Sequence, residues 1–311
     1  TEMLSFLWRA LLALPNLNRA HRPEFVIVFF SVPCGPLGWL MRLRYRVPYI
    51  ISLRGGDVPG FLPELDRLHG LLALVRRKCL RHAHAVVANS PPLVKLAQQA
   101  DGGILKMIPN GVDTDLFTPC QNGPARDTFR FIFVGRLTEQ KRLALALEAF
   151  NRLRQETTGH GASRLSVVGD GPLREELERK AEELGIADCV DWHGWVDRSR
   201  LGELYQQADC LLHTSNIEGM SNTVLEGMAS GLPVISSDGP GNRDVIVHDE
   251  NGLLFQVDNE EQLFQAMAAL KTDRALLGRL RKGSRQRALS HHSWAASARA
   301  YEDLFVVHRG T

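Results

Sequence analysis

The stretch FRFIFVGRLTEQKRLALALEAFNRLRQ, residues 129–155, decides the fold of this chain. It starts with an apolar run of strand length, passes through a loop that contains a glycine, and ends in a helical spacing of apolar residues. The same order recurs at residues 164–185, 190–208 and 210–231. Because strands that alternate with helices form parallel sheets, residues 118–290 predict one doubly wound α/β domain.

The first part of the chain, residues 1–117, repeats this alternation with fewer strands. Four segments have strand character there, whereas a complete Rossmann-like domain usually has about six strands. We therefore expect a partial Rossmann-like domain that is short of its opening strands. A first helix is expected over 1–20, with an interruption at Pro15. The strand candidates are residues 24–30, 48–54, 85–90 and 104–113, and further helices are expected at 35–46, 63–83 and 91–100.

The segment TPCQNGPARD, residues 118–127, is rich in proline, glycine and polar residues and is the predicted linker. A length of 311 residues suits two domains of ordinary size. Hydrophobic residues make up 44% and charged residues 23% of the chain, which indicates a globular protein. No apolar run approaches the ~20 residues of a membrane helix, and no signal peptide is recognisable.

Cysteine and histidine positions give no metal or disulfide signature. The cysteines form no CxxC pair, which argues against a zinc site and a disulfide framework and fits a reducing cytoplasm. His291 and His292 are adjacent, so they point in different directions on a helix and make poor partners for one metal ion. We therefore expect a cytoplasmic protein without a metal cofactor. The five cysteines are Cys34, Cys79, Cys120, Cys189 and Cys210.

Charge is distributed unevenly along the sequence. Residues 1–120 hold 14 Lys and Arg against 8 Asp and Glu, and the remaining residues hold 23 against 27. A basic first half could contact anionic lipid at the inner face of the membrane or an anionic acceptor. Two ordinary domains of unequal charge are the alternative. An apolar stripe over residues 3–14 has two similar interpretations, packing on its own domain or membrane docking, of which packing is favoured.

The stretch IEGMSNTVLEGMASG, residues 217–231, places two carboxylates around an expected helix start. Ser221 is the expected N-cap, and the free N–H groups of the first turn suit a phosphate. Glu218 and Glu226 lie eight positions apart, roughly 12 Å along a helix, which is too far to share a proton. Ionised carboxylates accept hydrogen bonds from sugar hydroxyls, so each could hold one sugar with phosphates between them. A capped helix with two exposed glutamates is the alternative.

Two other predicted strands end in residues that could meet the same ligand. Gly135, Arg136 and Lys141 follow the strand of the opening stretch, and ligands bind at such strand ends. The two cations could neutralise a diphosphate, although a solvated loop is an equally ordinary interpretation. VVGDGP, residues 167–172, ends another strand at Gly169 but lacks the GxGxxG pattern of a dinucleotide site.

Taken together, these segments resemble glycosyltransferase family 4. The resemblance rests on GRLTEQK, VVGDGPLREEL, HGWV, IPNGVD and SNIEGMSNTVLEGMASGLPVISSD in this order, and it extends over about residues 23–305. It implies the GT-B fold, with two Rossmann-like domains facing a cleft: residues 1–117 on the acceptor side and 118–290 for the nucleotide sugar. Residues 291–311 resemble the family's C-terminal helix, which crosses back to the first domain. The family normally begins with two or more strands and a glycine-rich loop, so the resemblance also implies a member that lacks roughly its first 80–100 residues.

The resemblance also implies roles for single residues in a retaining, metal-independent transfer from a nucleotide diphosphate sugar. Arg136 and Lys141 match the pair that binds and stabilises the leaving diphosphate. Glu218 matches the glutamate that contacts the transferred sugar, and these three are the expected catalytic residues. Glu226 matches the glutamate that holds the ribose. The further donor-binding positions implied are Gly135, Gly169, Trp195, Val196, Gly219, Met220, Ser221 and Asn222.

One departure from the family pattern concerns the acceptor side. The family usually has a histidine in an HGxD-like motif, where this chain has SLRGGDVPG with Arg54 and Asp57. Arg54 could bind an anionic group of acceptor or donor, or it could only pair with Asp57. His213 could approach the donor, but a packed role is favoured for it, and His193 is expected to be structural.

The expected function is a retaining glycosyltransferase that uses a UDP-sugar, with a GDP-sugar as the second choice. Its acceptor would be a glycan, a lipid-linked sugar or a small molecule, with no nucleic-acid partner. The alternatives are an epimerase-type GT-B enzyme and an inactive fragment that binds nucleotide sugars. Product analysis with the donor alone would identify the epimerase, because an epimerase converts the nucleotide sugar without an acceptor. A turnover assay would identify the inactive fragment, which binds the nucleotide sugar without transfer or hydrolysis.

Overall fold

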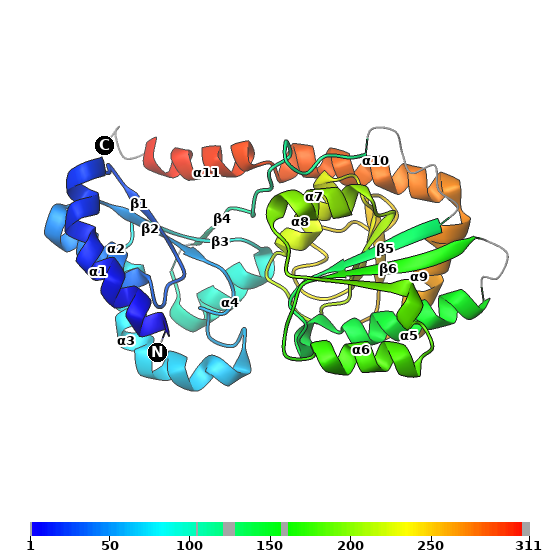
Figure 1. The fold of residues 1–311 in the computed structure, drawn as a ribbon. Helices are drawn as coiled ribbons and strands as arrows, with labels where there is room; N and C mark the ends of the chain where they lie inside the picture. The colour runs from blue at the N-terminus through cyan, green and yellow to red at the C-terminus, as the bar shows by residue number, and fades with distance from the viewer. Residues whose placement is uncertain (1, 104, 121–127, 157–160, 307–311) are drawn as a thin grey trace. The chain divides into compact units, whose positions relative to one another are not determined.

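The computed structural model describes residues 2–103, 105–120, 128–156 and 161–306. The chain forms two compact units, each with its own parallel sheet (Figure 1). Unit 1 comprises Thr1–Pro109 and Ala300–Thr311, and unit 2 comprises Asn110–Arg299. Most of the predicted linker, residues 121–127, lies outside the described residues.

Unit 2 contains a six-stranded sheet in the order β10-β9-β8-β5-β6-β7, and all its pairings are parallel. The first strand of the unit, β5, lies in the middle, with β6 and β7 to one side and β8 to β10 to the other. This is the strand order of a Rossmann fold, whose switch point lies between β5 and β8. The strands are β5 (Thr128–Val134), β6 (Ala162–Val168), β7 (Val190–Gly194), β8 (Cys210–His213), β9 (Val234–Ser237) and β10 (Gly252–Phe255).

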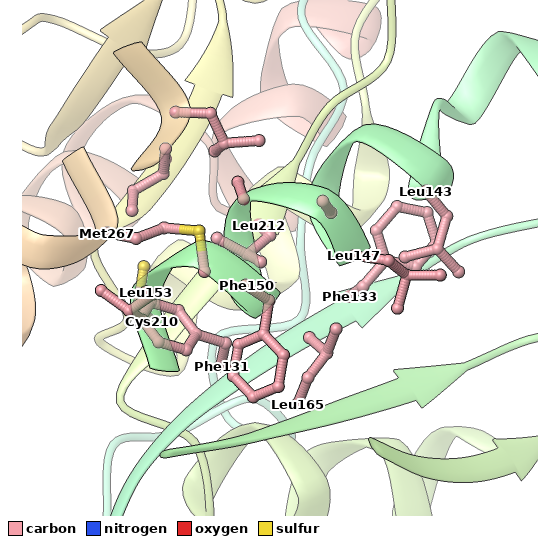
Figure 2. Close-up of a cluster of buried hydrophobic side chains, with 14 of the residues drawn as sticks. Phe131, Phe133, Leu143, Leu147, Phe150, Leu153, Leu165, Cys210, Leu212 and Met267 are labelled. Atoms are coloured by element: carbon pink, nitrogen blue, oxygen red, sulfur yellow. The ribbon is translucent and has the colours of Figure 1, made fainter. Parts of the chain in front are cut away.

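Helices cover both faces of this sheet, as the alternation of side chains along β5 requires. Phe131 and Phe133 point to one face and pack with Phe150, whereas Ile132 points to the other and packs with Leu225. Figure 2 shows the first of these clusters, built from buried side chains of several elements. The helices are α5 (Leu143–Glu156), α6 (Arg174–Glu183), α7 (Arg198–Gln206), α8 (Asn222–Ala229), α9 (Glu260–Thr272) and α10 (Arg274–His291).

Unit 1 contains a four-stranded parallel sheet in the order β1-β2-β3-β4. All five residues of β2 are buried, and they alternate between two cores: Tyr49 and Ile51 pack on one face and Ile50 on the other. A helix that begins in unit 2, α11, contributes Leu304 to the second core. The elements are α1 (Glu2–His21), β1 (Val26–Phe29), α2 (Gly35–Tyr45), β2 (Tyr49–Leu53), α3 (Asp66–His82), β3 (Ala85–Ala88), α4 (Pro91–Asp101), β4 (Leu105–Met107) and α11 (Trp294–Val306).

The predicted interruption of the first helix at Pro15 is wrong, because α1 continues through it over 20 residues. A proline removes one i→i−4 hydrogen bond, and a long helix retains enough others to persist. None of the helices within the described ranges is long and apolar enough to span a membrane.

Candidate functional site

The switch point of unit 2 brings two loops together. The loop after β5 and the loop after β8 are joined by hydrogen bonds between residues more than 70 positions apart in sequence. Thr214 Oγ1 donates to the Lys141 carbonyl at 2.7 Å, and Gln140 Nε2 donates to the Ile217 carbonyl at 2.8 Å. Because adjacent parallel strands end at the same edge, these bonds hold both loops at the place where Rossmann-type sheets bind ligands.

Lys141 and Glu218 meet at this place. Lys141 Nζ lies 2.5 Å from Glu218 Oε1, and Ser215 Oγ donates to the same oxygen at 2.7 Å. The side chains of the pair are only 19% and 14% exposed, so little water screens the interaction. Burial acts to raise the pKa of Glu218, but His213, Lys141 and Ser215 outweigh it and leave that pKa below its usual value. Glu218 is therefore a carboxylate at neutral pH.

Glu226 lies in α8 in a different environment. Its side chain is 16% exposed, with Tyr205 Oη 3.5 Å from one carboxylate oxygen and Arg198 Nη2 4.0 Å from the other. Burial raises the pKa of Glu226 to about 7, against the weaker opposing effects of Arg198 and Tyr205. The alternative of two exposed glutamates is thus wrong, because Glu218 and Glu226 are both largely buried.

Glycines allow the loops of this site to approach one another. A Cβ on Gly169, whose φ is +125°, would lie 2.0 Å from the carbonyl oxygen of Gly135. A Cβ on Gly241, in the loop after β9, would lie 2.2 Å from the Glu218 carbonyl and 2.5 Å from that of Gly219. Gly241 is absent from the sequence-based site, and it shows that a third strand end closes against the glutamate loop.

His213 is a second residue that sequence reasoning did not place at the site. It ends β8, is 2% exposed, and its Nε2 lies 3.8 Å from Glu218 Oε1. Burial lowers the pKa of His213 to about 4, so the ring is neutral near pH 7. The favoured packed role is consistent with this burial. The ring also lies beside the Glu218 carboxylate, on which the site depends.

The start of α8 differs in detail from its prediction. Ser221 occupies the N-cap position, but its side chain makes no capping hydrogen bond. Instead, Asn110 Nδ2 donates to the Met220 carbonyl at 3.1 Å and to Asn222 Oδ1 at 2.9 Å. The NGVD turn therefore fixes the loop that leads into the helix, because an amide has two donors for two acceptors.

Three other predicted residues, Arg136, Trp195 and Val196, lie at strand ends of unit 2 and differ in exposure. Arg136, next to Gly135, is exposed, and no ion pair is recorded for it with another described residue. Trp195 is 80% exposed after β7, whereas Val196 packs against the buried cluster beneath α7 and α8. Arg136 thus offers a free guanidinium, and Trp195 a free aromatic face.

Arg54 and Asp57 belong to unit 1, where they follow β2. The Asp57 carboxylate accepts from the backbone N–H of Ser31 at 2.6 Å, of Arg54 at 2.9 Å and of Gly55 at 3.2 Å. Burial raises the pKa of Asp57 against these hydrogen bonds. The Arg54 guanidinium stacks on Phe29, 4.6 Å from the ring centroid. Asp57 is therefore the residue that holds the ends of β1 and β2 together.

A site for a metal ion is not formed by the residues described: no group of three or more His, Cys, Asp or Glu side chains with that potential occurs among them. The site in unit 2 instead combines cations, acceptors and free backbone groups, which suits an anionic, hydroxyl-rich ligand.

Two Rossmann-like units, one with a lysine–glutamate pair at its switch point, define the class of GT-B glycosyltransferases. The family model of the group 1 glycosyl transferases matches residues 118–287, and that of Glycosyltransferase Family 4 matches residues 2–116. The chain belongs to this family and is a glycosyltransferase.

Relatives and solved structures agree with this assignment. The chain is 30% identical over 303 residues to a D-inositol 3-phosphate glycosyltransferase of Xylanimonas cellulosilytica, covering 88% of this chain and 69% of that protein. It spans between 46% and 62% of the length of the next curated relatives it matches.

The fold is similar to that of sucrose-phosphate synthase from Thermosynechococcus elongatus, with a TM-score of 0.79, 23% identity and coverage of 95% and 77% of the two chains. It is also similar to Anabaena HepE in complex with UDP-glucose, with a TM-score of 0.76, 19% identity and coverage of 94% and 81%. At this level of identity the likeness concerns the fold.

Proposed function

We propose that the chain is the catalytic part of a retaining glycosyltransferase that takes its sugar from a UDP-sugar, with a GDP-sugar as the second choice. The observation that carries this proposal is the Lys141–Glu218 pair at the β5–β8 switch point, with Glu226 in the helix that follows. HepE, a protein of similar fold, was solved with UDP-glucose, which supports UDP as the first choice. We also propose that the enzyme is cytoplasmic.

In the proposed donor complex, each group has a separate task. Lys141 and the exposed Arg136 neutralise the diphosphate, and the first turn of α8 donates N–H groups to it. Glu218 accepts hydrogen bonds from the transferred sugar, and Glu226, when ionised, accepts from the ribose hydroxyls. Trp195 and Val196 lie beside the base.

The transfer itself needs positioning more than side-chain acid or base chemistry. The acceptor hydroxyl oxygen bonds to the anomeric carbon on the face from which the diphosphate leaves, so the configuration is retained. The bond between the anomeric carbon and the diphosphate oxygen breaks, and that oxygen takes the acceptor's proton. Lys141 and Arg136 stabilise the negative charge that develops on the leaving group.

The acceptor is a glycan, a lipid-linked sugar or a small molecule, and we assign its binding to unit 1. Arg54 replaces the histidine that the family usually has at this position, so an anionic group on the acceptor is the proposed partner of its guanidinium. Asp57 holds the loop that presents Arg54.

Donor binding tests this proposal directly. Arg136→Ala and Glu226→Ala are each expected to weaken UDP or GDP binding about 10-fold or more, because each removes a charge-assisted contact. Calorimetric titration gives the affinities. Arg154→Ala and Glu203→Ala remove one positive and one negative charge elsewhere in unit 2. They are the controls and should leave the nucleotide affinities unchanged. Unchanged affinity in both site variants would remove the site from consideration, and an inverted anomeric product would remove the retaining mechanism.

A further inference from the structure

Helix α3 of unit 1 buries two polar residues, His69 and Arg76, beside the apolar Cys79, and it exposes leucines on the opposite side. His69 is 6% exposed and Arg76 is 3% exposed. Leu71 and Leu74, by contrast, are both 83% exposed. Surface helices normally turn most of their leucines towards the core, so this exposed apolar face is unusual.

The buried contacts of α3 fix its rotation about its own axis. Arg76 donates from Nε and Nη2 to the two carboxylate oxygens of Asp101, each at 2.9 Å. Tyr49 Oη donates to the Cys79 carbonyl at 2.6 Å. Turning the leucines inward would break this buried, two-pronged ion pair and leave both charges without partners. The packing of unit 1 itself therefore keeps the apolar face of α3 exposed.

The exposed face of α3 combines an apolar stripe with positive charge. Leu68 and Val75 are 41% and 44% exposed and extend the stripe of Leu71 and Leu74 at helical spacing. Asp66, in the first turn, is the single acidic residue of the helix. The exposed cationic residues of α3 are Arg67, Arg77, Lys78, Arg81 and His82.

We infer that this face, the α3 stripe (Leu68, Leu71, Leu74 and Val75 with its flanking cations), docks on the surface of an anionic lipid bilayer. A helix of 17 residues, about 25 Å long, with leucines between cations at both ends suits the plane of the headgroup region. The leucines enter the acyl boundary, and the cations contact anionic headgroups. This inference concerns a partner of unit 1 and does not depend on the proposed donor.

Self-association through the same stripe fits the charges less well. In a two-fold pair of α3 helices, an antiparallel arrangement would bring Arg67 of one copy towards Arg81 and His82 of the other, and a parallel arrangement would bring each cation towards its own counterpart. Like charges at both ends would oppose such a pair. An anionic lipid surface, by contrast, accommodates the apolar stripe and attracts the cations that flank it.

Vesicle flotation of the full chain tests the docking. The probes are phosphatidylcholine vesicles alone and vesicles with about 30% phosphatidylserine, at about 0.1 M and 0.5 M salt. Binding is expected only to the anionic vesicles and is expected to fall at the higher salt. The double variant Leu71→Ser, Leu74→Ser should bind about 10- to 100-fold more weakly, and Arg67→Glu with Arg81→Glu should bind weakly at both salt concentrations.

Matched controls separate α3 from other exposed apolar residues. Leu289→Ser, on α10 of unit 2, should leave vesicle binding unchanged, since Leu289 is 47% exposed but lies outside the stripe. Trp8→Ser with Leu12→Ser, on α1, tests the other apolar helix of unit 1, whose two residues are 65% and 62% exposed. Loss of binding in this α1 variant alone would overturn the assignment to α3.

Two further readouts complete the test. Sedimentation of the α3 serine variant should match that of the unchanged protein. A change from dimer to monomer without an effect on vesicle binding would make the stripe a protein interface and overturn the inference. UDP affinity should be the same in this variant and the unchanged protein, so a failure of docking and a failure of the proposed donor site give different results.

Discussion

The buried carboxyl group of Glu226 links stability to function at the scale of a single residue. Its pKa in the folded protein is about 7, above the usual glutamate value of 4.5. The folded state therefore binds this proton more tightly than the unfolded state. The resulting stability is fully present below pH 4.5 and is lost as the pH rises through 7. Above pH 7 the site keeps an ionised carboxylate in a place that disfavours it.

Glu226→Gln is expected to raise the free energy of unfolding at pH 8 by about 2 kcal/mol, because it removes a desolvated charge. Urea unfolding at pH 8 and pH 4 measures the effect, and the gain should disappear at the lower pH. Glu203→Gln is the control, since the side chain of Glu203 is 57% exposed. A stability change of the same size in both variants would contradict the role of burial.

Donor affinity should depend on pH in the opposite direction. A protonated Glu226 has lost acceptor capacity for the ribose, so the affinity for UDP-glucose should rise as the pH increases through about 7 and then level off. Titrations between pH 5.5 and 8.5, roughly one and a half units to either side of that pKa, measure it. The same series with Glu226→Gln should be flat, and a slope that persists in this variant must come from another group.

The charged residues at the β5–β8 switch point are easier to predict from the sequence than their neighbours. Lys141 and Glu218 are recognisable because each follows a strand, and adjacent parallel strands end at one edge. His213 has the same signal but a packed role is favoured for it, and Gly241 is not singled out by the sequence at all. Their place beside Glu218 depends on the depth of β8 in the sheet and on the path of the loop after β9, which are tertiary properties.

At the scale of elements, the loops at the ends of neighbouring strands pack so closely that they leave little space for an added side chain. Gly169→Ala would place a Cβ 2.0 Å from the Gly135 carbonyl oxygen at a φ of +125°, so backbone must move. We expect a loss of about 3 kcal/mol or more, read from thermal or urea unfolding. Gly278→Ala, in α10, meets no atom within 4 Å and should stabilise by about 0.5–1 kcal/mol. Two effects of the same sign would contradict this account.

Two arginines of α3 contact the same carboxylate and differ in burial. Arg76→Ala is expected to destabilise the protein by about 3–5 kcal/mol, because Asp101 would remain as a buried charge without its main partner. Arg77 is 48% exposed and lies 3.4 Å from Asp101, so Arg77→Ala should cost less than about 1 kcal/mol. Urea unfolding of both variants gives the comparison. Equal losses would show that burial does not separate the two pairs.

Element prediction succeeds where apolar runs are long or strictly spaced. Strands β2 and β5 and helix α5 follow from such runs. Strand β10 has four residues between turns, and its pairing with β9 is visible only when the sheet is assembled. Helix α3 is correctly placed, but the exposure of its leucines depends on the buried ion pair between Arg76 and Asp101, which periodicity alone does not reveal.

At the scale of the whole molecule, the two α/β units and their parallel sheets follow from the alternation of strands and helices. The return of the chain to unit 1 matters for stability, because Leu304 is 6% exposed and packs with Ile50, Val87 and Ile108. Leu304→Ala should destabilise unit 1 by about 2–4 kcal/mol. Amide hydrogen exchange should then be faster in β2 and β3 and unchanged in β5. Glu302→Ala is the control and should change neither the stability of unit 1 nor these exchange rates.

Unit 1 is built from two separate segments of the chain, Thr1–Pro109 and Ala300–Thr311, and this affects how domains of this family can be exchanged between homologues. A chimera that exchanges residues 1–109 with a homologue, and keeps everything else, would set a foreign sheet against the native Tyr301 and Leu304. Tyr301 Oη lies 2.7 Å from Ser52 Oγ, so polar as well as apolar contacts would be mismatched. Modular shuffling of acceptor specificity therefore requires two crossovers, one on each side of unit 2, and libraries made with a single crossover should yield mostly unstable hybrids.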